Sequence, residues 1–266
     1  MAPILWGSLT IKCETMSTAK LTALMHPDNG IIRHVRRIFV WFDSEQPLEA
    51  LPEDFRASIH LIINTLPNNT LLGFRTDMAF QPEFLLNLLR HQQTLVDLEI
   101  LTQEEDQSSS ISFEVAAHGS WISAALRDLK RLTVYIGSRD QTYQNSAYII
   151  KNAPKLEELD IEADNSDMPS LTSSQSCDAF GGPYADNVAV QPLQLTRFSL
   201  RWLDLSPLQP RSLLTYVNFS GLRSLSLDSC GDLGPFLTAL ATQFSQNCNL
   251  IELKIAMPAD HTALED

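Results

Sequence analysis

The sequence predicts an α/β repeat protein in which short parallel strands alternate with helices. A motif of the form apolar-x-x-apolar-x-apolar returns along the 266 residues, and each copy shows the two-residue alternation of a strand. Most stretches between copies change to the 3.6-residue period of an amphipathic helix. The copies recur roughly every 30 residues, which favours stacked strand–helix units.

The strands are expected where the motif occurs. Clear copies begin at Leu95, Leu129, Leu156, Leu195, Leu222 and Leu250, and fainter copies begin at Trp6, Val35 and Leu71. Because 44% of the residues are apolar, the motif also arises by chance. The prediction therefore depends on the alternation of the two periods rather than on the number of copies.

Apolar stripes at helical spacing predict the intervening helices. They are Phe55, Ile59, Ile62, Ile63 and Leu66; Leu85, Leu88 and Leu89; Trp121, Ala125, Leu126 and Leu129; and Leu233, Leu237, Leu240, Ala241 and Phe244. Pro207 and Pro210 restrict a further helix to about residues 211–217. We expect a single domain over residues 1–266, with a disordered or surface insertion rich in Ser, Asp and Gly at about 164–192.

The copy Leu222-Arg-Ser-Leu225-Ser-Leu227-Asp-Ser-Cys230 resembles the cysteine-containing leucine-rich repeat, in which Cys or Asn turns the chain off the strand. The resemblance implies a leucine-rich-repeat solenoid, with a curved parallel sheet and helices on its outer face. Other copies hold unrelated residues at the turn position, such as Asp43, Gly137 and Leu203. No continuous Asn or Cys ladder then supports the turns, so we expect an irregular solenoid.

The first two copies resemble the stretch that follows the F-box in fungal F-box/leucine-rich-repeat proteins. The residues concerned are Leu5-Trp-Gly-Ser-Leu-Thr-Ile11 and His34-Val-Arg-Arg-Ile-Phe-Val40. The resemblance implies that the repeats hold a ubiquitin-ligase substrate, and that a Skp-type adaptor binds only if an F-box lies upstream. Leu51-Pro-Glu-Asp-Phe55 resembles the start of an F-box, but the helical stripe that begins at Phe55 favours a helix between two strands of the repeats.

Composition narrows the choice of partner. With 19 basic and 32 acidic residues the formal net charge is −13, which argues against nucleic acid and anionic membranes. This negative charge fits two interpretations: an acidic surface that is simply solvated, or a protein that attracts a basic partner. The apolar runs are too short to span a bilayer, no signal-peptide pattern opens the chain, and its four cysteines are scattered. We therefore expect a cytoplasmic or nuclear protein.

The sequence offers no pattern that predicts catalysis. It contains no GxSxG, P-loop, GxGxxG or HExxH, so we expect a protein that is not an enzyme and needs no cofactor or metal. His60 and His91 are expected to pack beside helices, and Cys230 to support a turn. An α/β hydrolase or transferase is the alternative, although its doubly buried strands would be near-continuous apolar runs. A folded fragment that recruits nothing is a third possibility.

The candidate binding residues come from the alternation of the strands. Motif positions one, four and six point into the core, so positions three, five and seven point outward on one shared face. The candidate partner-binding residues are Arg37, Phe39, Trp41, Arg75, Asp97, Glu99, Arg131, Tyr135, Glu158, Asp160, Glu162, Arg197 and Arg201. Glu158, Asp160 and Glu162 would align three carboxylates for a basic partner. Phe39 and Trp41 would be aromatic anchors, unless the N-terminal strand covers them.

Overall fold

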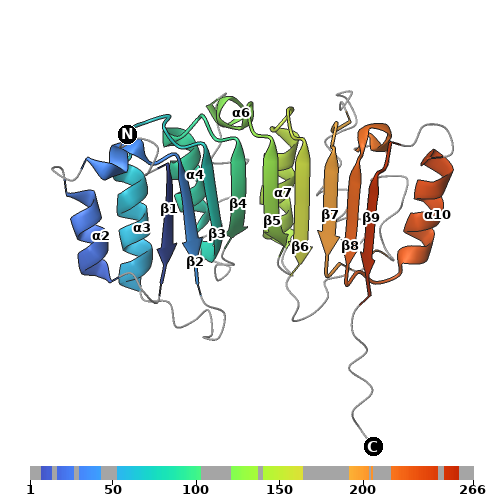
Figure 1. The fold of residues 1–266 in the computed structure, drawn as a ribbon, viewed down its shortest axis with the longest axis horizontal. Helices are drawn as coiled ribbons and strands as arrows, with labels where there is room; N and C mark the ends of the chain where they lie inside the picture. The colour runs from blue at the N-terminus through green and yellow to red at the C-terminus, as the bar shows by residue number, and fades with distance from the viewer. Residues whose placement is uncertain are drawn as a thin grey trace, which may run out of the picture. The chain divides into compact units, whose positions relative to one another are not determined.

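The computed structural model describes residues 7–13, 17–26, 30–42, 53–102, 121–136, 140–163, 192–203, 205, 217–244 and 249–257. Within these ranges strands and helices alternate along the chain, and each strand pairing given below is parallel (Figure 1). The protein is thus of the mixed α/β class, as predicted. The chain groups into two compact units, which are unit 1 (Met1–Leu132 with Asn152–Pro154) and unit 2 (Thr133–Lys151 with Lys155–Asp266).

In the described residues of unit 1, four strands pair in sequence order. Its elements are β1 (Ser8–Lys12), α2 (Thr18–Met25), η2 (Ile31–His34), β2 (Arg37–Trp41), α3 (Glu53–Thr65), β3 (Gly73–Phe80), α4 (Pro82–His91), β4 (Asp97–Thr102) and α6 (Trp121–Leu126). The next strand, β5 (Arg131–Ile136), contains the boundary between the units. Ser8, Arg37, Gly73 and Asp97 stand side by side in the register of β1 to β4.

Unit 2 repeats this arrangement in its own strands. Its elements are α7 (Asp140–Lys151), β6 (Glu158–Ala163), β7 (Arg197–Arg201), η5 (Phe219–Gly221), β8 (Ser224–Asp228), α10 (Leu233–Phe244) and β9 (Glu252–Ala256). The strands pair in the order β6-β7-β8-β9. Their register sets Glu158 beside Arg197, Arg197 beside Ser224, and Ser224 beside Glu252.

The predicted motif has one structural meaning throughout the chain, since every described strand begins at motif position three. The backbone bonding is repeated as well. The N–H groups of Arg36 and Arg37 both donate to the Gly7 carbonyl, at 2.9 and 3.0 Å. In unit 2, Arg223 and Ser224 donate in the same way to the Thr196 carbonyl, at 2.8 and 3.1 Å. Each copy is thereby fixed in register with the copy before it.

The predicted stripes of α3 and α4 are buried, whereas Trp121 of the α6 stripe is half-buried. The stripe residues of α3 and α4 face the core, whereas Leu61 of α3 is exposed, and α4 lies behind β3 and β4 (Figure 1). Phe80 stacks on Phe84 with ring centroids 4.2 Å apart, and Phe74 packs beside both. His60 meets the Phe84 ring edge-on at 4.5 Å, which confirms its predicted packing role. His91, by contrast, bonds Asn68 at 3.0 Å.

Several details of the helices differ from the prediction. In α10 the buried face is centred on Phe236 and Leu240, whereas Ala241 is exposed, because the helix is rotated relative to the predicted stripe. Helices α2 and α7 were not predicted. The insertion was predicted at 164–192, and all of it except residue 192 lies outside the described residues. The helix predicted at 211–217 likewise lies outside them except for residue 217. Val217 itself forms a parallel bridge with Leu193.

Candidate functional site: the strand face

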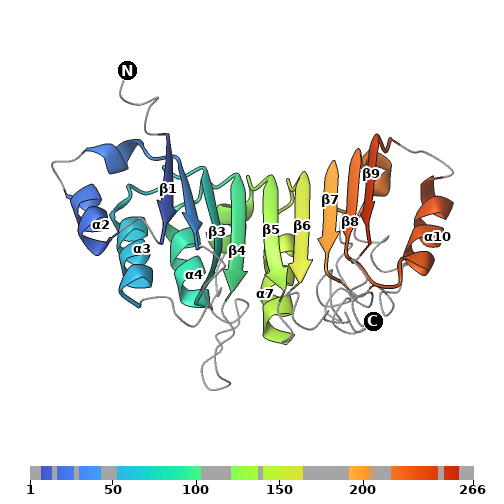
Figure 2. The same ribbon diagram turned by 60° about the horizontal axis from the view of Figure 1, so that its bottom comes forward.

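We define the strand face as the surface that carries motif positions three, five and seven. In β6 and β8 these side chains are half-buried, whereas their neighbours at positions four and six are buried, as the alternation predicted. The described helices of each unit pack on the other side of its strands. In unit 2, for example, α7 lies behind β5 and β6 in both views (Figures 1 and 2).

In unit 1 the strand face carries arginines over a buried carboxylate. Asp97 is only 5% exposed. It accepts hydrogen bonds from Nε and Nη2 of Arg75 at 2.9–3.2 Å, and Nη2 of Arg131 lies 3.4 Å from its Oδ2. Glu99 is 9% exposed. Asp97 and Glu99 were expected to face a partner directly, and their burial contradicts that expectation. The long side chains of Arg75 and Arg131 on neighbouring strands contact and cover the shorter Asp97.

Arg37 crosses the neighbouring strand over a glycine. A Cβ atom added to Gly73 would lie 3.3 Å from Cγ of Arg37 and 3.5 Å from Cβ of Asp97. The missing side chain therefore leaves the space along which the stem of Arg37 runs. Arg37 is exposed, and its guanidinium makes no hydrogen bond or ion pair with the described residues. Gly73 was not among the predicted site residues, although its position three on β3 is the signal that would have identified it.

Phe39 and Trp41 are half-buried on the same strand as Arg37. Strand β1 lies beside them, with Thr10 opposite Phe39 and Lys12 opposite Trp41. The N-terminal strand thus borders these two aromatic residues and leaves part of each exposed. Both stay candidates for contact with a partner.

In unit 2 the three carboxylates of β6 align as predicted. Arg201 neutralises Glu162 through an ion pair of 3.0 Å, and the Glu162 side chain is 12% exposed. Glu158 and Asp160 are half-buried beside Arg197 and Ser199. Oδ1 of Asp160 is buried and has no hydrogen-bond partner in the part of the chain that the structure describes. The carboxylates that a partner could engage are therefore those of Glu158 and Asp160.

The rows of the strand face continue onto β8 and β9, beyond the predicted site residues. Ser226 and Lys254 follow Asp160 and Ser199 in the register. Glu252 accepts a hydrogen bond from Ser224 at 2.8 Å, and Lys254 lies 2.9 Å from it. Lys254, together with Ser224 and the more distant Arg197, lowers the pKa of the Glu252 carboxyl. Reading positions three, five and seven of the last two copies would have found these residues. Tyr135, the remaining candidate, is half-buried on β5 in unit 2.

Cys230 has the structural role that the repeat turn predicts. Its thiol is buried and donates to the Leu200 carbonyl at 3.4 Å. Burial raises the pKa of this thiol, so it stays protonated at neutral pH and is a poor nucleophile. The preceding Ser229 takes the left-handed conformation (φ 52°), as does Trp202 (φ 53°) at the same place after β7. The two turns thus share one geometry although their residues differ.

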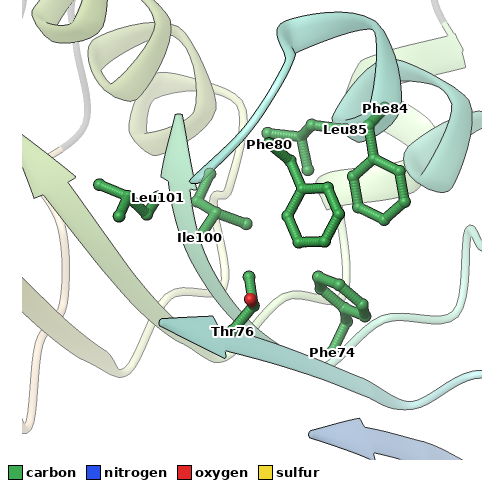
Figure 3. A pocket seen from close by; sticks show the side chains of 7 residues that line it. All are labelled: Phe74, Thr76, Phe80, Phe84, Leu85, Ile100 and Leu101. Atoms are coloured by element: carbon green, nitrogen blue, oxygen red, sulfur yellow. The ribbon is translucent and has the colours of Figure 1, made fainter. Parts of the chain in front are cut away.

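A small gap lies in the core of unit 1 (Figure 3). Its volume is about 10 Å³, and it is lined by Phe74, Thr76, Phe80, Phe84, Leu85, Ile100 and Leu101. The Thr76 hydroxyl already accepts a hydrogen bond from the Met78 N–H at 2.9 Å. A gap of this size is close to the minimum that one water molecule needs, so it is too small for a ligand. It lies beside the register shift between Arg75 and Ala79 in β3.

Comparison with known proteins adds little. No family model and no curated protein matches the chain. A solved structure of a protein from Bacteroides fragilis aligns over 91% of this chain and 73% of its own, at 11% identity and a TM-score of 0.38. In the described part of the chain no helix is long and apolar enough to cross a membrane. Nor do those residues bring together three of His, Cys, Asp or Glu as a set of metal ligands.

Proposed function

We propose that this protein is a non-catalytic scaffold that binds a partner protein on its strand face. One observation carries the proposal. The same three motif positions place charged and aromatic side chains on one face in both units, and the described helices pack on the other side. Arginine and aromatic residues are common anchors of protein interfaces, and complementary charge gives such interfaces their specificity.

We propose further that the strand–helix units form an irregular leucine-rich-repeat solenoid. Its role would resemble that of the substrate-binding repeats of an F-box-type ubiquitin-ligase receptor. Two features support the repeat interpretation. All described strands begin at the same motif position, and the paired donation to a single carbonyl recurs from copy to copy.

For unit 2 the partner is expected to be basic. Among the described residues neither Glu158 nor Asp160 forms an ion pair, whereas Glu162 is engaged by Arg201. A buried carboxylate oxygen without a donor, such as Oδ1 of Asp160, is costly. A lysine or arginine side chain from a partner at the face would neutralise the carboxylate charge.

Charge reversal tests this proposal. The double variant Glu158→Lys/Asp160→Lys should weaken capture of a basic peptide, (Lys-Ser)6, at both low and physiological salt. Glu157→Lys reverses a single neighbouring charge at motif position two, and it should leave capture within about twofold of the wild type. Unchanged capture by the double variant would remove β6 from the binding surface.

A further inference from the structure

We propose that the strand face of unit 1 binds an acidic segment of a partner protein, with its carboxylates held by Arg37, Arg75 and Arg131. The inference rests on the proposed function, because it assumes that the strand face is a recognition surface. It gives unit 1 a charge preference opposite to that of unit 2. The net charge of −13 favours a basic partner for the chain as a whole, and an acidic partner for unit 1 differs from that expectation.

The depth of the charges is the first argument. Asp97 and Glu99, the acidic residues on β4 of this face, are buried. Arg37 is exposed, and the side chains of Arg75 and Arg131 are 34% and 39% exposed. A molecule that approaches this face therefore meets guanidinium groups first. Each guanidinium has five N–H donors in a planar fork that matches a carboxylate. Arg37 makes no ion pair within the described residues, so its charge is available to a ligand.

Spacing is the second argument. Arg37 lies on β2 and Arg131 begins β5, and the N–H of Arg131 donates to the Val96 carbonyl at 3.0 Å. Three strand spacings separate the two arginines, which is about 14 Å. Alternate side chains of an extended peptide are about 6.7 Å apart, so a Glu-x-Glu-x-Glu segment spans about 13 Å. Such a segment could cross the strands with a carboxylate near each arginine.

The aromatic residues supply the third argument. Phe39 and Trp41 follow Arg37 at alternate positions on β2, and both are partly exposed. An apolar side chain next to the acidic segment would pack on them, and its burial would add affinity that depends little on salt. The predicted ligand is therefore an extended acidic segment with an apolar or aromatic residue at one end.

Fluorescence anisotropy of the full chain with labelled (Glu-Ser)6 tests the inference. At about 0.15 M salt the Debye length of about 8 Å screens the distant acidic surface but leaves direct ion pairs effective. We expect saturable binding that Arg37→Gln weakens roughly tenfold. Arg36→Gln is the matched control, because Arg36 is exposed and lies one residue earlier at motif position two. It should change the affinity less than about twofold.

The outcomes separate this inference from the proposed function. Equal losses in Arg36→Gln and Arg37→Gln would show non-specific attraction and would overturn the inference. No binding of (Glu-Ser)6, with (Lys-Ser)6 still held through Glu158 and Asp160, would also overturn it but leave the proposed function standing. Failure of both peptides would contradict the strand face as a recognition surface. Because the Arg37 side chain makes no hydrogen bond or ion pair with the described residues, Arg37→Gln should unfold at the same urea concentration as the wild type, which excludes misfolding as the cause.

Discussion

The strand faces of units 1 and 2 are built by the same motif in the same backbone register, yet they present different charges. In unit 1, Asp97 is covered by Arg75 and Arg131, so arginines meet the solvent. In unit 2, Glu162 is the one acidic residue among those described that Arg201 engages, and Glu158 and Asp160 are half-buried at the face. The motif thus decides which side chains share a face. Their cross-strand neighbours decide which charge that face presents.

The two units also differ in how completely their strands are buried. Leu98 of β4 and Leu253 of β9 both occupy motif position four, but Leu98 is fully buried and Leu253 is 50% exposed. All five residues of β9 are exposed, and so are Ile251 and Met257 on either side. Equal positions in the motif therefore do not contribute equally to stability.

The largest expected effect tests this difference in burial. Leu98→Ala should lower the free energy of unfolding by about 3 kcal/mol, because it leaves a cavity in a closed core. Leu253→Ala should cost less than about 1 kcal/mol, since much of the removed surface already contacts water. Urea unfolding of both variants measures the contrast, with buried Leu225→Ala as the control within unit 2. A cost for Leu253→Ala equal to that for Leu225→Ala would show that β9 is covered in solution.

Replacing two aspartates by asparagine should change the free energy of unfolding by a smaller amount, and in different directions. Asp97→Asn should cost about 2 kcal/mol, because Arg75 and Arg131 lose the charge that they share. Asp160→Asn should be neutral or slightly stabilising, because its buried Oδ1 has no partner to lose and the desolvated charge is removed. Urea unfolding at pH 7 compares the two variants. Destabilisation by Asp160→Asn as large as that by Asp97→Asn would mean that Asp160 is paired in solution.

The smallest effects concern pH and again have opposite signs. Burial raises the pKa of Asp77 above its ordinary value of 3.8, while the Phe42 N–H partly offsets this shift. The free energy of unfolding therefore falls as pH rises from about 3.8, the ordinary pKa, through the raised pKa of the folded state. Asp77→Asn should accordingly be stabilising at pH 7 and neutral below about pH 3.8. Asparagine keeps an oxygen that accepts from Phe42.

Glu252 provides the opposite case in unit 2. Its pKa is lowered from 4.5, so its charge stabilises the fold above that pH, and this contribution is lost as pH falls through the lowered value. Glu252→Gln should therefore be slightly destabilising at pH 7 and neutral in acid. Urea midpoints between pH 3 and 7 record both variants. Shifts of the same sign would contradict the assigned environments of the two carboxyl groups.

The start of each strand and the alternation of its side chains could be predicted from the sequence, because period-two patterning depends only on local order. The pairing of Asp97 with two arginines could not, since it requires the register between strands and the length of each side chain. The buried face of α10 was predicted only in part. Leu240 was assigned to it correctly, but Phe236 was missed because Leu233, Leu237 and Ala241 also fit the helical period. Arg37 was placed on the correct face, but the path of its side chain across Gly73 depends on a neighbouring strand.

The central claim is that the strand face reaches solvent in both units, at motif position five of β1 and of β8 among other places, and cysteine labelling tests it most directly. Thr10→Cys in unit 1 and Ser226→Cys in unit 2 would each be treated with iodoacetamide under native conditions, with buried Cys230 as the internal reference. Both new thiols should react at least about a hundredfold faster than Cys230, because a buried thiol of raised pKa reacts only after local opening. Labelling of either new cysteine at the slow rate of Cys230 would show that the strand face is covered, and would contradict the account.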